Sequence, residues 1–486
     1  SLPSNGHSGY TPPRAAASAD AGEASSSAVA WHCYVPESDL ALTQADETAS
    51  RAAISNETLS TTLALGTPKS LYIDHGYSSS LTKFTEDEAT LRAIGSSCYV
   101  WVIDDYYSES ASGKFVSDDV AAQIAAQFDS IYPLVRTVFG QESDAMLDFR
   151  GEPKYPMASM SPTSTMVNIV LYDIAADYSE KSTSTTGIAG YFYSKDYYYA
   201  ASDITNRGKY FYIDSAYANE NANDIYSTLA HEFQHMINFG VKNIAQGLES
   251  GTAYNEMLSM LCEDMLSVYF ADALTGFTND ATPINRLPYF NKLYYLSGLE
   301  YRADSTAYTL CSYATNYAFG AWLLRNYGGI PLLAALSQNA SVDIASIENA
   351  VNSENGTALT ITDLLAGFAA ACLVKKSDYG FNRAVLAEST QNDYCYKSEK
   401  LSYEYPLQAI DLWNLAAMLP EAYEDYKRAT SYYKFDGAQL FASNQYNALR
   451  PYGMMLHKLG TATASTVTLT FSSSGAAALS MYVVIE

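Results

Sequence analysis

Two histidines and a glutamate stand together in one short stretch, "TLAHEFQHMINFG", residues 228–240. His231 and His235 are four residues apart, so on a helix they lie one turn above each other on the same face. Two imidazoles at this spacing can bind one Zn²⁺, and Glu232 can act as general base on the attacking water. The chain has only 6 histidines. The stretch therefore predicts a catalytic zinc site.

A third ligand is needed, because catalytic zinc takes three protein ligands and keeps one position open. Glu256, in "YNEMLSMLCEDM", follows His235 by 256 − 235 = 21 residues, which leaves room for a helix end, a turn at Gly240 and a return helix. Glu263 is 263 − 256 = 7 residues further on, so it shares a helix face with Glu256. We expect this carboxylate face to meet the histidines. The alternative for all these groups is an ordinary solvated surface.

The two helices must also carry apolar faces that hold the polar ones in place. On the first helix the opposite side carries Leu229, Phe233, Met236 and Ile237. On the second, Asn255 and Ser259 share the side of the glutamates, and the other side carries Leu258, Leu261, Cys262 and Met265. We expect the apolar stripes to pack into a core and to turn the histidines toward a cleft.

A sheet is predicted upstream of these helices. Apolar runs at residues 98–105, 167–173, 188–194 and 209–214 are typical of strands. Between the first two lies a helix, with Ser117 as its N-cap, two aspartates in its first turn and a stop near Gly140. Nearly everything from the histidine helix to about residue 373 has a helical pattern. The fold class is therefore α+β, with a sheet-bearing upper lobe and a helical lower lobe.

Four regions follow from composition and pattern. Residues 1–30 are rich in Ala, Ser, Gly and Pro, which indicates a disordered leader or tether. Residues 31–97 are expected to form an N-terminal β-rich segment, residues 98–376 the catalytic domain, and residues 377–486 a C-terminal β-rich domain. The chain begins "SLPSNGHSGY" without an initiator Met, so we expect that any export signal or lipid anchor, if there was one, has been removed.

Composition excludes several partners. With 28 Lys and Arg against 53 Asp and Glu, the formal net charge is −25, which repels nucleic acid. No apolar run approaches the roughly 18 residues that a membrane span needs. The 6 cysteines are widely spaced, and either disulfides or buried free thiols, as for Cys262, fit them. The 42 tyrosines, with runs such as residues 197–199, are interpreted as strand surface and domain contacts with wet hydroxyls.

HEFQHMINF followed by NExxSxxxED resembles the gluzincin zinc peptidases, and closely resembles the hyicolysin-like secreted bacterial neutral metalloproteases. Further similar stretches extend the likeness over about residues 98–335. The resemblance implies that His231, His235 and Glu256 bind zinc and that Glu232 is the base. It also implies that Glu263 receives the free N–H of a ligand histidine, which fixes the tautomer of the ring. Met257 departs from the glycine usual in this family, which would narrow the approach to the third ligand.

The resemblance also implies a tyrosine that stabilises the oxyanion. Alignment on the glycine pair at residues 328–329 selects Tyr313, and Tyr317, one turn later, is the second candidate. His457 is a third, if the last domain leans over the cleft. By analogy, the strand at residues 190–193 would pair with an extended substrate peptide.

The leading hypothesis is a secreted or surface-tethered bacterial zinc endopeptidase, expected to be a monomer that acts on proteins or peptides. A zinc aminopeptidase is an alternative, although the GxMEN loop of such enzymes is absent from the sequence. A catalytically silent surface binding protein on the same scaffold is another. Ca²⁺ could bind the acidic run at residues 215–224, which is more simply a solvated loop.

Overall fold

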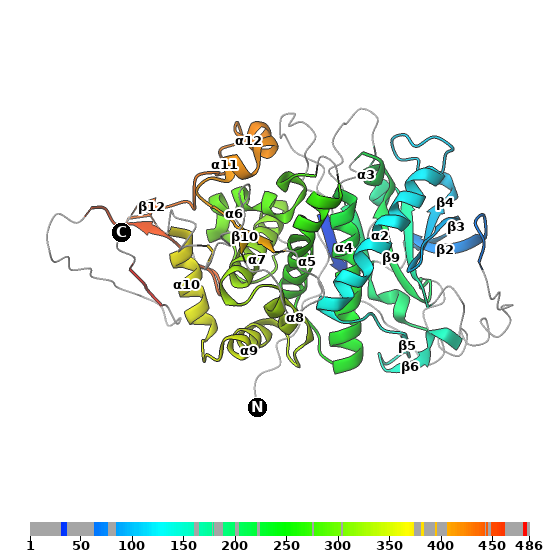
Figure 1. Cartoon of the computed structure of the whole chain (residues 1–486), viewed down its shortest axis with the longest axis horizontal. Helices are drawn as coiled ribbons and strands as arrows, with labels where there is room; N and C mark the ends of the chain where they lie inside the picture. The colour runs from blue at the N-terminus through cyan, green and yellow to red at the C-terminus, as the bar shows by residue number, and fades with distance from the viewer. Residues whose placement is uncertain are drawn as a thin grey trace.

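The computed structural model describes residues 31–35, 63–75, 84–159, 165–176, 178, 188–199, 204–220, 224–274, 277–302, 305–373, 381–382, 394–395, 406–442, 444–445, 449–461 and 480–483. These form a sheet-bearing half and a helical half side by side, with helices α4 and α5 near the middle (Figure 1). Both helices and sheets are present, as the α+β prediction requires.

The main sheet of the described chain has 7 strands in the order β1-β8-β9-β7-β4-β3-β2. β4, β7 and β9 run parallel to one another, whereas β8 is antiparallel to β9 and β1 is parallel to β8. β2 and β3 extend the other side by antiparallel pairing. The strands are β1 (Trp31–Val35), β2 (Pro68–Asp74), β3 (Phe84–Ile94), β4 (Cys98–Ile103), β7 (Val167–Tyr172), β8 (Ile188–Tyr193) and β9 (Lys209–Asp214).

All four predicted strands are confirmed, with ends within two residues of the predicted ones. β7 and β9 are buried at every position, which explains their continuous apolar and aromatic sequences. The described residues of the predicted N-terminal segment, 31–97, contribute β1, β2 and β3 to this same sheet, across the boundary predicted at residue 97. Two further short strands, β5 (Ala145–Leu147) and β6 (Pro153–Pro156), form a separate hairpin.

Helix α2 (Asp118–Phe139) covers one face of the sheet and confirms its predicted limits. The Ser117 side chain accepts a hydrogen bond from the Val120 backbone N–H, and Gly140 ends the helix with a φ of 100°. The apolar side of α2 packs between sheet and histidine helix, since the Phe128 ring lies 5.7 Å from that of Phe211 and 5.0 Å from that of Phe233. α2 thereby fixes the height of the histidine helix over the sheet.

The helical half is built around α5 (Thr252–Ala273), in which every residue from Tyr254 to Val268 is buried. α4 packs on one side of α5 and α7 on another. The remaining helices are α3 (Ser215–Glu220), α4 (Asp224–Asn238), α6 (Leu287–Leu293), α7 (Thr306–Tyr327), α8 (Ile330–Gln338), α9 (Asp343–Asn355), α10 (Ile361–Leu373), α11 (Leu415–Met418) and α12 (Pro420–Tyr426). The helical prediction for residues up to 373 is confirmed over the described part.

The tyrosine prediction is wrong for the sheet. Tyr172, Tyr191 and Tyr212 are at most 2% exposed, and the rings of Tyr191 and Tyr212 stack with centroids 4.6 Å apart. Their hydroxyls bond within the protein, as when those of Tyr172 and Tyr191 meet at 2.8 Å. The run at residues 197–199 is also buried. Tyr172, Tyr191 and Tyr212 can be core residues because their buried hydroxyl groups have hydrogen-bond partners.

The C-terminal part is described only in pieces. After residue 377 these pieces contain α11, α12 and two pairs of two-residue strands, β10 (Tyr394–Cys395) with β11 (Leu407–Gln408), and β12 (Phe441–Ala442) with β13 (His457–Lys458). The strands predicted near the C-terminus fall mostly outside the described residues. The same holds for part of the acidic run considered for Ca²⁺, whose first six residues form α3.

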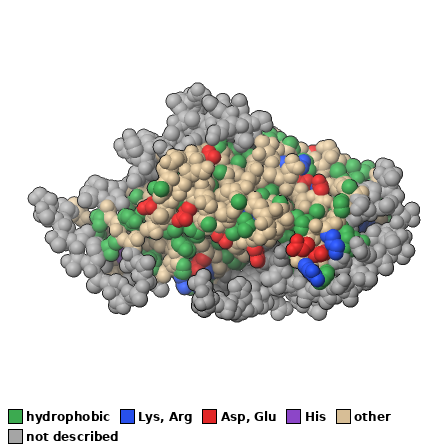
Figure 2. All heavy atoms as spheres, turned by 90° about the horizontal axis from the view of Figure 1, so that it is seen from below, with side chains coloured by type: hydrophobic (Ala, Val, Ile, Leu, Met, Phe, Trp, Pro, Cys, Tyr) green, Lys and Arg blue, Asp and Glu red, His purple; other side chains and the backbone are tan. Residues whose placement is uncertain are grey.

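Two further expectations concern surface and cysteines. Within the described residues, the helices are either too short or too polar to cross a bilayer. Figure 2 shows one face, on which acidic side chains are scattered with few basic ones, in keeping with the net charge of −25.

Cys98, Cys262, Cys311 and Cys372 are buried free thiols. The side chains of the other two cysteines lie outside the described part of the chain.

Candidate metal centre

Helix α4 carries the two histidines, and its apolar side is anchored as expected. Leu229, Phe233, Met236 and Ile237 are all 0% exposed. Gly190 of β8 lets α4 approach the sheet closely, because a Cβ there would lie 2.9 Å from Thr228 Cγ2 and 2.8 Å from the Tyr212 carbonyl oxygen. The sheet therefore sets the position of the histidine helix through packing.

The turn predicted at Gly240 is wrong. The chain continues in a wider helical turn, η8 (Phe239–Ala245), and reverses only before α5 begins at Thr252. Gly240 serves another purpose, since a Cβ there would lie 2.8 Å from the Ser143 backbone nitrogen. Gly247, with a φ of 65°, lies in the actual reversal. The return helix itself is confirmed, and it lies against α4.

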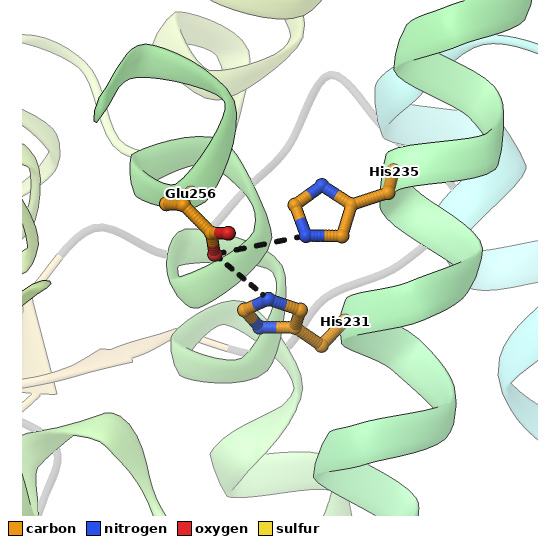
Figure 3. Close-up of side chains that lie close together, drawn as sticks. All are labelled: His231, His235 and Glu256. Carbon is orange, nitrogen blue, oxygen red and sulfur yellow. Dashed lines mark hydrogen bonds and ion pairs between the residues drawn. The ribbon is translucent and has the colours of Figure 1, made fainter. Parts of the chain in front are cut away.

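The two helices bring His231, His235 and Glu256 together (Figure 3). Nε2 of His231 lies 3.1 Å and Nε2 of His235 lies 3.6 Å from Oε2 of Glu256. One ligand atom from each residue lies within 4.8 Å of the others. Ligands about 2.0–2.1 Å from a tetrahedral zinc are about 3.3–3.4 Å apart, so the two distances to Glu256 fit a shared ion.

The opposite nitrogen of each ring is held by α5. His231 Nδ1 donates to Oε1 of Glu263 at 2.7 Å, as the resemblance implied. His235 Nδ1 lies 3.1 Å from Oδ1 of Asn255 and 3.0 Å from Oγ of Ser259. Sequence reasoning placed Asn255 and Ser259 on this face but gave them no role. With both Nδ1 atoms donating, both Nε2 lone pairs are free to bind a metal.

The prediction that the histidines face a cleft is wrong for this structure, in which they are enclosed. His231, Glu232 and His235 are 0% exposed, Glu256 is 2% exposed and Glu263 is 4% exposed. Three carboxyl groups and two imidazoles are buried together here, and burying so many ionisable groups is costly unless their charges are compensated. The donor set and its charge thus fit a divalent cation, and nitrogen donors favour zinc over calcium or magnesium.

The same arrangement shifts the pKa values. Burial would lower the pKa of His231, but its hydrogen bonds to Glu256 and Glu263 raise it from 6.5 to about 10. Burial lowers the pKa of His235. For Glu256, burial would raise the pKa, but the two histidines hold it well below 4.5. Glu256 is therefore ionised, as a metal ligand must be.

Glu232 lies between α4 and strand β8. Burial raises the pKa of its carboxyl well above 4.5; His231 opposes this rise and the charge of Glu256 adds to it. The backbone N–H of Phe192, in β8, donates a hydrogen bond to this carboxylate. A carboxyl with a raised pKa is a stronger base once ionised, which suits a general base. β8 thus borders the group predicted to move the proton.

Two contacts fix α5 against α7. Met257 is directed at Gly320 of α7, where an added Cβ would lie 2.8 Å from Met257 Cγ. The bulk of this methionine is therefore accommodated between α5 and α7, beside the third ligand. Next to Glu263, the carboxylate of Asp264 binds Arg325 through two hydrogen bonds of 2.6 and 2.9 Å, and both side chains are 0% exposed.

The three candidates for the oxyanion donor have different surroundings. Tyr313, in α7, is 2% exposed, with Tyr301 at a ring distance of 5.9 Å and the Arg286 guanidinium 5.2 Å from its ring centre. Tyr317 is buried, and burial together with the charges of Asp264 and Glu263 raises its pKa well above 10.0. The ring of His457 bonds to the Ala442 carbonyl in the β12–β13 pair, and Figure 1 shows β12 far from α4. The choice between the tyrosines stays a prediction.

Comparison with known proteins gives one informative relative. No family model matches the chain. The neutral metalloprotease ShpI of Staphylococcus hyicus is 29% identical over 310 residues, which are 61% of this chain and 61% of that protein. The chain is thus related to a neutral metalloprotease, in agreement with the resemblance predicted from the motifs. The match spans less than two thirds of the length of that relative.

Proposed function

We propose that this chain is a zinc-dependent endopeptidase. The observation that carries the proposal is the cluster of His231, His235 and Glu256, whose ligand atoms converge while Glu232 projects from the same helix turn. The relation to a neutral metalloprotease supports the same reaction class. His231, His235 and Glu256 would hold the ion, and Glu263, Asn255 and Ser259 would orient the two rings.

The chain's own residues supply the proton transfers. When bound, zinc would act as a Lewis acid that polarises a water molecule and the scissile carbonyl. Glu232 takes a proton from the attacking water and later gives it to the departing amine. The Phe192 N–H fixes the carboxylate of Glu232 against β8. A hydroxyl of α7, from Tyr313 or Tyr317, donates to the oxyanion of the tetrahedral intermediate.

The substrate would be an extended stretch of protein or peptide. Main-chain pairing along β8 would present successive peptide bonds to Glu232 whatever the side chains, which favours internal cleavage. We propose a location outside the cytoplasm, secreted or tethered, and a monomeric state. Cell fractionation and sedimentation velocity test these two points.

The central experiment compares the wild type with Glu232→Gln. The variant should bind one equivalent of zinc and lose at least about 10²-fold in hydrolysis of unfolded protein, because only the base is removed. Glu109→Gln, at an exposed glutamate, is the matched control. If wild type and Glu232→Gln both bind zinc and neither cleaves denatured protein nor a peptide library, the chain is a silent binding scaffold instead.

The aminopeptidase alternative needs a separate measurement. An endopeptidase cleaves peptides whose amino terminus is acetylated, and it produces internal fragments. An aminopeptidase is blocked by acetylation and releases single amino acids. Mass spectrometry of products from paired free and acetylated peptides therefore distinguishes the two reactions.

A further inference from the structure

Strand β8 is paired on both sides, although only one of its neighbours belongs to the parallel core of the sheet. On the inner side it pairs with β9. On the outer side it pairs with β1, the first described segment of the chain, in parallel. The register places His32 opposite Gly190, Cys33 opposite Tyr191, Tyr34 opposite Phe192 and Val35 opposite Tyr193. β1 is therefore the outermost strand at this end of the sheet.

This end of the sheet is the one that borders the metal centre. Phe192 of β8 donates its backbone N–H to Glu232, and Gly190 lies against Thr228 of α4. The backbone of β1 also comes close to both α4 and α5, the two helices that supply the ligands. Figure 1 shows it as the dark blue strand beside these helices. β1 thus occupies the space next to the metal centre and next to β8 at once.

We propose that β1 is a built-in inhibitory strand that blocks substrate access by filling the outer edge of β8. The inference rests on the proposed peptidase function and concerns its regulation. An edge strand offers one free row of N–H and C=O groups, and two peptides cannot use the same row. A substrate peptide that pairs with β8 must therefore displace residues 31–35 first.

Covalent attachment makes this block effective. A segment tethered to its own binding surface has an effective concentration of about millimolar, so even weak pairing outcompetes dilute substrate. Cutting the chain between β1 and β2 would turn the tethered strand into a free peptide that dissociates on dilution. Proteolytic removal of the N-terminal segment is then the activating event. The competing interpretation, in which β1 is a permanent strand of the sheet, predicts no gain of activity on its removal.

The first test uses the zinc-loaded full chain with Cys33→Pro and Tyr34→Pro together. Proline has no N–H. Because the N–H groups of successive residues in a strand point to opposite edges, one of the two prolines removes an N–H that would point toward β8. The matched control is Cys33→Ala with Tyr34→Ala, which keeps both N–H groups. We expect about tenfold higher kcat/KM for peptide hydrolysis in the proline variant, little change in the alanine variant, and faster hydrogen exchange of the β8 amides in the proline variant alone.

A second form of the test keeps the strand intact during folding. A recognition sequence for a site-specific protease is inserted directly after Val35, and the folded, zinc-loaded protein is then cut and diluted. The kcat/KM should rise as the fragment leaves, and a synthetic peptide of residues 29–37 should reverse the rise. If the fragment leaves, as gel filtration would show, and kcat/KM stays at the uncut value, the inhibitory role of β1 is overturned.

The two proposals fail in different ways. Exchange of the β8 amides reports displacement of β1 without reference to catalysis. If β8 is deprotected in the cut protein while a wild type that hydrolyses peptides gains nothing, the inhibitory strand is wrong and the peptidase proposal stands. If β8 is deprotected and no form of the protein hydrolyses any peptide, the peptidase proposal falls and the inhibitory role falls with it. Equal activation by the alanine variant would overturn main-chain pairing as the cause of the block.

Discussion

The Nδ1 atom of His231 lies 2.7 Å from Oε1 of Glu263, across the ring from the nitrogen that faces Glu256. Glu263 therefore selects the tautomer of His231 whose Nε2 can bind a metal. The two glutamates of α5 act on opposite edges of one imidazole, so the return helix both orients a ligand and supplies another.

Replacing Glu263 with glutamine should weaken zinc binding about 10- to 100-fold, because the orienting acceptor loses its charge. Competition with a chromophoric chelator measures the affinity. Glu109→Gln, on an exposed loop, should leave the affinity unchanged. An unchanged affinity in Glu263→Gln would show that the packing of α4 alone fixes the ring.

Replacing Arg325 with methionine should lower the free energy of unfolding by about 3–5 kcal/mol, because it leaves the buried Asp264 carboxylate without its partner. Urea denaturation measures the loss. Adding Asp264→Leu to the same chain should recover much of it. Recovery will be incomplete, since Arg325 also donates to the Gln408 and Ala321 carbonyl oxygens. Equal stability of the single and double variants would contradict this explanation.

Replacing Gly320 with alanine should destabilise the α5–α7 contact by about 1–3 kcal/mol, because the new Cβ would lie 2.8 Å from Met257 Cγ and 2.9 Å from Leu261 Cδ1. Met257→Ala in the same chain should relieve the overlap, so the two substitutions should be strongly non-additive in a double-mutant cycle. Additive effects would mean that the two side chains do not compete for this space.

Alkaline solution should destabilise the fold. Burial, helped by the charge of Asp173, raises the pKa of Tyr106 from 10.0 to about 12, and burial raises the pKa of Cys311 from 9.0 to about 12. Between the pKa values of the unfolded chain and those of the folded chain, the unfolded chain has lost protons that the folded chain keeps. The stabilisation is therefore complete below about pH 9 and is lost as the pH rises toward 12.

Urea denaturation at a series of pH values from 8 upward measures this slope. Tyr106→Phe should make it shallower, because phenylalanine has no proton to lose. A free energy of unfolding that stays constant up to pH 11 would contradict the assigned burial of these groups.

The local elements were predictable because their signals are local. Ser117 and Gly140 marked the ends of α2, and the spacing of His231, His235 and Glu256 was enough to predict that they meet. Helix periodicity and capping depend on residues within a few positions of one another. The role of Glu263 came from the resemblance, and its contact with His231 is confirmed.

The remaining features depend on which surfaces are covered, and periodicity does not reveal this. Tyr191 and Tyr212 alternate as strand residues should, but both faces of their sheet are buried. Glycine is a residue type common in turns, yet at Gly240 the lack of a side chain allows the backbone of Ser143 to pack closely. The pairing of β1 with β8 joins segments more than 150 residues apart, and nothing in either sequence specifies the partner.

The contacts that form the metal centre join residues only 20 to 32 positions apart in the chain. Closing so short a loop costs little conformational entropy compared with assembling the distant strands of the sheet. Zinc binding should therefore tolerate substitutions in the sheet that peptide hydrolysis does not tolerate. Changes that distort β8 should abolish turnover while the α4–α5 hairpin still retains its metal.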